Sequence, residues 1–73
     1  MTASFNPQAW LEAFEAVGGW YLVTRDRRIS VGWMLGDVAH GVQARLLFKE
    51  IQHSDERRAV LKEHVLSRQR IPA

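Results

Sequence analysis

The sequence predicts a small single domain of the α+β class, with the order helix, β-hairpin, helix, helix over residues 1–73. Amphipathic stretches with helix start signals lie near both ends of the chain. Between them, two runs rich in β-branched and aromatic residues flank a charged turn. The chain is 47% hydrophobic and contains no cysteine, so it is apolar enough to fold without disulfides. A chain of this length buries a small core, and self-association is a natural supplement.

The first helix is expected to begin at Pro7 and to end at Gly18-Gly19. Asn6 can cap its first turn, and proline suits the first helical position because its missing N–H is not needed there. The apolar residues that should share its inner face are Ala9, Trp10, Ala13, Phe14 and Val17.

The hairpin is expected to pair residues 20–24 with residues 29–35 around the turn Arg25 to Arg28. Its register depends on the length of the loop. A loop of two or four residues would bring three pairs together on the buried face: Trp20 with Trp33, Leu22 with Val31, and Thr24 with Ile29.

The other face of that hairpin is expected to be the functional one. In this register Tyr21 lies opposite Gly32 and covers its bare backbone. An apolar cluster rimmed by arginines is typical of protein interfaces, and both strands have open edges that could pair with a partner's strand. The predicted partner-binding residues are Tyr21, Val23, Met34, Arg25 and Arg28.

The segment from Val38 to Gln52 is predicted to be helical, with a third strand at 42–48 as the alternative. Ala44, Leu47 and Ile51 recur at helical spacing, whereas the same stretch also alternates between apolar and polar residues. Gly41 disfavours a helix start before about residue 42, so Gly36 to Gly41 is expected to be a loop or a frayed turn.

The last helix is expected to begin after Ser54, a good capping residue, and to end before Pro72. Asp55 and Glu56 lie in its first turn, where carboxylates complement the helix dipole, and Arg68 and Arg70 lie near its end.

No catalytic or metal-binding motif is present in the sequence. His40, His53 and His64 have no second ligand three or four residues away, which a metal site on one helix or tight loop requires. We therefore expect no enzymatic activity, no cofactor, no metal site and no small-molecule substrate.

The basic residues suggest an alternative partner. The formal net charge is only +2, but arginines cluster in the hairpin turn and again in the last helix. These two clusters could contact phosphates, so nucleic-acid binding is the alternative function. The residues that would carry it are Arg25, Arg27, Arg28, Arg57, Arg58 and Lys62.

The favoured function is protein interaction, in the manner of a small adaptor or inhibitor, with self-association through the β-hairpin into a homo-oligomer. The partner is then either another protein or a second copy of this chain. The first residues lack a basic region followed by an apolar one, and no apolar run is long enough to span a membrane. We therefore expect a cytoplasmic protein without a membrane partner.

Overall fold

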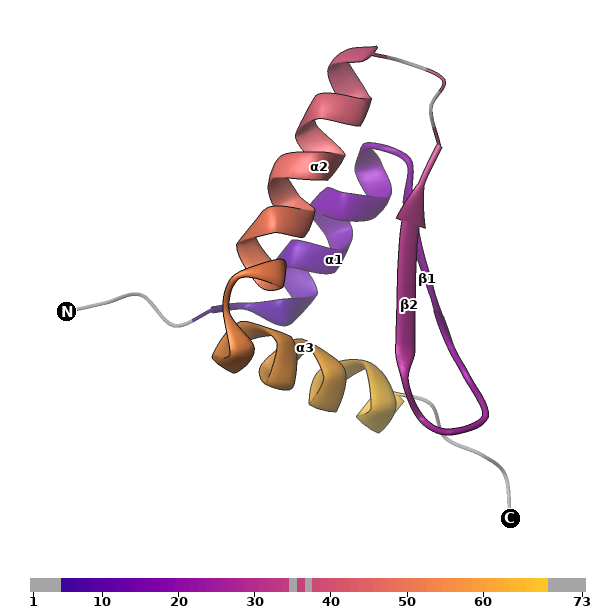
Figure 1. The fold of residues 1–73 in the computed structure, drawn as a ribbon, viewed down its shortest axis with the longest axis vertical. Helices are drawn as coiled ribbons and strands as arrows, with labels where there is room; N and C mark the ends of the chain where they lie inside the picture. The colour runs from indigo at the N-terminus through magenta and orange to yellow at the C-terminus, as the bar shows by residue number, and fades with distance from the viewer. Residues whose placement is uncertain (1–4, 35, 37, 69–73) are drawn as a thin grey trace, which may run out of the picture.

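The computed structural model describes residues 5–34, 36 and 38–68 of the chain. It confirms the α+β fold and the predicted order of helix, two-stranded antiparallel hairpin and two helices (Figure 1). The elements are α1 (Pro7–Ala16), β1 (Gly19–Val23), β2 (Ile29–Trp33), α2 (Val38–Gln52) and α3 (Asp55–Arg68).

Helix α1 begins as predicted. The Asn6 side chain accepts a hydrogen bond from the backbone N–H of Ala9 at 3.1 Å, and Pro7 occupies the first turn. The predicted inner face is wrong in part, because Ala9 and Ala13 are exposed while Leu11 is buried. The buried face of α1 is therefore rotated toward Leu11 relative to the predicted stripe, and α1 contacts the hairpin and both other helices.

The hairpin forms one layer and the three helices form the other (Figure 1). Between them, Trp10 stacks on Phe14 with ring centroids 4.7 Å apart, and Trp33 lies between the rings of Phe14 and Phe48 at 6.3 and 5.6 Å. The indole N–H of Trp10 donates to the carbonyl of Leu47 at 3.0 Å, which ties α1 to α2. The buried core consists of Trp10, Leu11, Phe14, Ala44, Ile51, Leu61 and Val65.

The hairpin register differs from the prediction by one residue. The loop has three residues, because Thr24 pairs with Arg28 through a backbone N–H···O bond of 2.8 Å. Arg27, the last loop residue, has a φ of 62°, in the left-handed region where a three-residue loop needs its final residue. The Thr24 hydroxyl also bonds the backbone N–H and carbonyl of Arg28, each at 3.2 Å, and this fixes the loop.

A loop of odd length shifts the pairing by one residue, which moves every side chain of β1 to the opposite face relative to the side chains of β2. The observed pairs include Trp20 with Gly32 and Tyr21 with Val31. The predicted inner positions of Trp20, Leu22 and Thr24 are therefore wrong, and the side chains of β1 that pack on the helices are Tyr21 and Val23. On the inner face of β2, the prediction is confirmed for Ile29, Val31 and Trp33.

Helix α2 rules out the third strand at 42–48 and begins earlier than expected, at Val38. Ala44 is buried and Phe48 is half-buried, whereas Val42 and Leu46 are exposed on the opposite side of the helix. Gly41 lies inside the helix, not in a loop. Its cost of about 1 kcal/mol in a helix interior is offset because Ala44 and Ile51 pack into the core.

Helix α3 begins as predicted after Ser54, whose hydroxyl accepts the backbone N–H of Arg57 at 3.2 Å. Two side chains of α3 reach back to α1: His64 and Arg68 both bond the Gln8 side-chain oxygen, at 2.9 and 2.8 Å. The predicted positions of Arg70 and Pro72 lie outside the described residues. Within the described part of the chain, the helices are too short or too polar to cross a bilayer.

Candidate functional site

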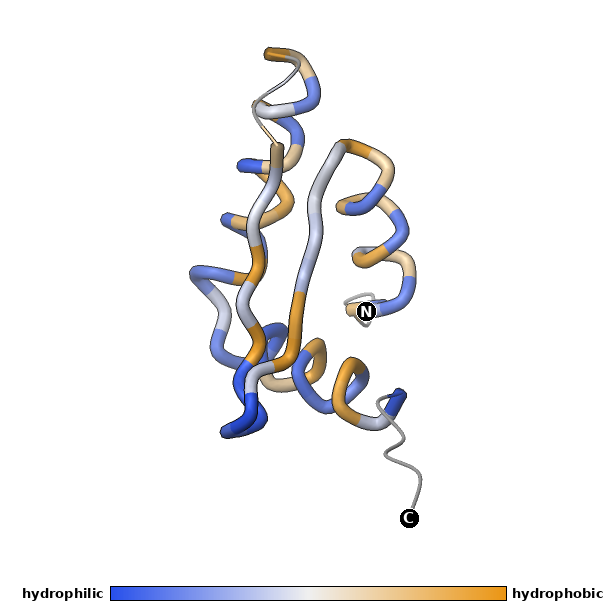
Figure 2. The backbone as a smooth tube through the Cα atoms, turned by 90° about the vertical axis from the view of Figure 1, so that its right-hand side faces the viewer, coloured by the Kyte–Doolittle hydropathy of each residue, from blue (hydrophilic) through white to orange (hydrophobic). Residues whose placement is uncertain are grey.

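The outer hairpin face is the first candidate surface, and it consists of Trp20, Leu22, Ser30, Gly32 and Met34. In the described part of the chain all three helices lie on the other side of the sheet, so nothing covers this face (Figure 2). Trp20, Leu22 and Met34 are 46%, 49% and 71% exposed. Adjacent exposed apolar side chains of this size are unusual on a solvated strand face and are common at protein interfaces.

Trp20 has a structural role on this face as well. A Cβ atom added at Gly32 would overlap the Trp20 indole, which therefore lies directly over the bare backbone of the opposite strand. The prediction that an aromatic ring covers Gly32 is thus right in kind and wrong in residue, since Trp20 does so and not Tyr21.

The five predicted partner-binding residues do not form one surface. Met34 is exposed on the outer face, and Arg25 and Arg28 are exposed at the hairpin tip. Tyr21 and Val23 are half-buried and pack against the helices. Trp20 and Leu22 were not predicted to bind a partner. The one signal in the sequence that could have pointed to this face is Gly32, because a glycine in a strand favours a large aromatic side chain opposite it.

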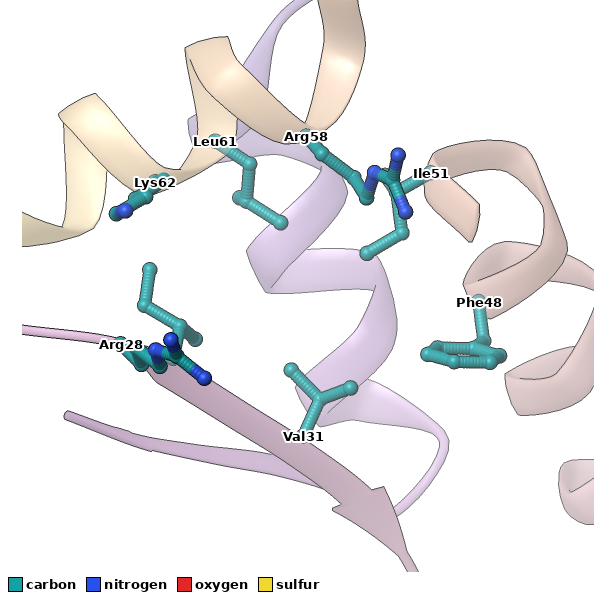
Figure 3. A pocket seen from close by; sticks show the side chains of 8 residues that line it. Arg28, Val31, Phe48, Ile51, Arg58, Leu61 and Lys62 are labelled. Carbon is teal, nitrogen blue, oxygen red and sulfur yellow. The ribbon is translucent and has the colours of Figure 1, made fainter. Parts of the chain in front are cut away.

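A second candidate is a groove of about 370 Å³ between β2 and the corner where α2 meets α3 (Figure 3). Its apolar floor contains half-buried Phe48 and the buried side chains of Ile51 and Leu61. The described residues that line it are Arg28, Ile29, Val31, Phe48, Ile51, Arg58, Leu61 and Lys62, and the charged ones among them are all basic.

The groove brings together three of the six residues predicted to bind nucleic acid: Arg28 from the hairpin tip, and Arg58 and Lys62 from α3. Arg27 lies beside Lys62 in a neighbouring hollow. The other two lie elsewhere among the described residues. Arg25 lines neither hollow, and Arg57 pairs with Glu50 at 3.3 Å and lies 5.6 Å from the Phe5 ring.

Two of the three groove cations have carboxylate neighbours. Arg28 lies 3.3 Å from Asp26, and Arg58 is paired with Asp55 one turn earlier in α3. Both pairs are largely exposed, so each holds its arginine only weakly. Lys62 has no ion pair with the described residues, and its ammonium is the least compensated charge of the groove.

The described residues contain no group of three His, Cys, Asp or Glu side chains placed to hold a metal ion. His64 bonds the Gln8 side chain of α1. Comparisons with family models, with curated proteins and with solved structures found no match to this chain. A functional proposal therefore depends on the two surfaces described above.

Proposed function

We propose that this chain is a non-enzymatic, cytoplasmic protein-interaction domain that forms a homodimer through its outer hairpin face. The observation that carries the proposal is the exposed cluster of Trp20, Leu22 and Met34 on a sheet face that none of the described helices covers. Tryptophan and methionine are enriched at interface centres, where burial of large apolar side chains supplies most of the binding free energy.

The size of the core supports a dimer. Among the described residues only seven side chains are buried, and the sheet has just two strands, which is marginal without further packing. Packing two outer faces together would make a sandwich of two hairpins with a helix layer on each side. The apolar surface removed from water would then stabilise both copies.

Charge selects the relative orientation of the two hairpins. Each tip carries Arg25, Arg27 and Arg28 against one carboxylate, Asp26. If the two hairpins ran in the same direction, their tips would meet and the arginines would repel one another. In an antiparallel dimer with twofold symmetry the tips lie at opposite ends, so this is the arrangement we propose.

Sedimentation across a concentration series, with a matched pair of variants, tests this proposal. Leu22→Lys places a charge at the centre of the interface, whereas Leu46→Lys makes the same change on the far side of α2, where Leu46 is similarly exposed at 58%. We expect association for the parent chain and for Leu46→Lys, and a monomer for Leu22→Lys. A parent chain that is monomeric throughout, or a Leu22→Lys variant that still associates, contradicts the proposal.

A further inference from the structure

The helix layer is wider than the sheet that covers it. Viewed from the hairpin side, α1 extends beyond β1 at one edge and α2 extends beyond β2 at the other (Figure 2). The groove lies at the β2 edge, since its strand residues all belong to the Arg28 to Val31 stretch and none to β1. Apolar surface from Phe48, Ile29 and Val31 is consequently left half-buried beside an open strand edge.

The backbone of β2 is ready to pair at this edge. The backbone groups of Arg28 and Met34 point toward β1. The carbonyl of Arg28 accepts the N–H of Thr24, and the N–H of Met34 donates to the carbonyl of Gly18 at 3.2 Å. In an antiparallel pair, alternate residues point their N–H and C=O groups inward and outward. The backbone groups of Ile29, Val31 and Trp33 therefore point away from β1, toward the groove side, where no other strand pairs with them in the described part of the chain.

The groove also has a charge preference that varies along its length. Arg28 and Lys62 lie at one end, near the hairpin tip, and Phe48 lies at the other, with the Arg58 side chain between them beside Ile51 (Figure 3). A ligand that fits would present carboxylates at the first end and an apolar side chain at the second. Residues two apart in an extended strand point the same way about 7 Å apart, which suits such an arrangement.

We propose that this groove binds an extended acidic segment of another protein, which adds to the free edge of β2 as a third strand. Its backbone pairs with Ile29, Val31 and Trp33, an inward apolar side chain packs on Phe48, and an inward carboxylate meets Lys62 and Arg28. Strand addition of this kind takes affinity from the backbone and specificity from alternate side chains. The site uses a surface different from the dimer interface proposed above.

Two other occupants fit the groove less well. A second copy of β2 would bring its own Arg28 and no carboxylate, because the strand Ile29–Trp33 contains none, so it offers no charge complementarity. A nucleic acid would supply phosphates, but among the described lining residues Phe48 is the only aromatic one on which a base could stack. The apolar floor and the open strand edge favour a peptide.

Fluorescence anisotropy tests the proposal on the full chain with a labelled peptide of the sequence Glu-Thr-Val-Thr-Glu-Thr-Val, in which glutamate and valine lie on the same face of the strand. We expect saturable binding at low salt that weakens as salt rises. Lys62→Glu should weaken it by roughly tenfold, whereas Lys49→Glu, the same change at an exposed site of α2 outside the groove, should leave it within about twofold. Methylation of the peptide amides that face β2 should abolish binding, and methylation of the opposite amides should not.

Several results would overturn it: no binding of the peptide, equal binding of the same peptide with lysine in place of glutamate, or equal loss of binding in Lys62→Glu and Lys49→Glu. Tighter binding of a DNA oligonucleotide that Lys62→Glu abolishes would also overturn it, in favour of nucleic acid. If the peptide competed with self-association, the β2 edge would be the surface that binds a second copy of this chain, and the proposal would be wrong. We expect the peptide to bind Leu22→Lys as it binds the parent chain, and Lys62→Glu to sediment as the parent chain does. Together these two results would show that the groove and the dimer interface are different sites.

Discussion

The two faces of the hairpin have similar side chains and opposite surroundings. On the inner face, Tyr21, Val31 and Trp33 pack against the helices, while on the outer face Trp20 and Leu22 are about half exposed. Composition alone does not distinguish these faces, since each has a tryptophan and branched aliphatic residues. The three-residue loop that ends in Arg27 decides between them, because an odd loop fixes which side chains of β1 share a face with those of β2.

The largest expected difference between the faces is found at their two glycines. Gly19 lies on the inner face, where an added Cβ would overlap the ring of Phe14. Phe14 is fully buried between Trp10 and Trp33, so it cannot move away. We expect Gly19→Ala to lower the free energy of unfolding by about 3 kcal/mol, the upper range for overpacking a core, as measured by urea denaturation.

Gly32→Ala makes the same change on the outer face and should cost less. The added Cβ meets the Trp20 indole, which is 46% exposed and can rotate into solvent. We expect a loss below about 1 kcal/mol, because alanine also regains part of the cost of a glycine in a strand. In a Trp20→Ala background the loss should vanish. Both glycines are best compared in the Leu22→Lys background, and equal costs at the two sites would mean that the faces do not differ as described.

Local signals predicted most of the fold. Asn6 with Pro7 fixed the start of α1 and Ser54 that of α3, since each cap satisfies backbone groups within one turn. The predicted hairpin register was wrong because the loop Arg25-Asp26-Arg27 contains no glycine to mark the left-handed position, where arginine is uncommon. The predicted start of α2 was wrong because the packing of Ala44 and Ile51 outweighs the low helix propensity of Gly41.

The candidate site was predictable only as a set of residues. The sequence marks Arg28 and Lys62 as members of two basic clusters, but their meeting across the groove depends on how α3 lies against the hairpin. The sequence also marks the hairpin as the element with an exposed apolar face, but the register decides which of its residues are exposed. Both properties arise from tertiary packing, which no local pattern encodes.

The smallest predicted effect concerns the loop that sets the two faces apart. Arg27→Gly should raise the free energy of unfolding by about 0.5 kcal/mol, because relief of the left-handed conformation exceeds the added chain entropy of glycine. Arg27→Val, with a β-branched side chain in the same conformation, should lower it by about 1 kcal/mol. Urea denaturation measures both. If valine and glycine were equal, Arg27 would not be left-handed, the loop would not have three residues, and Trp20 and Leu22 would return to the buried face.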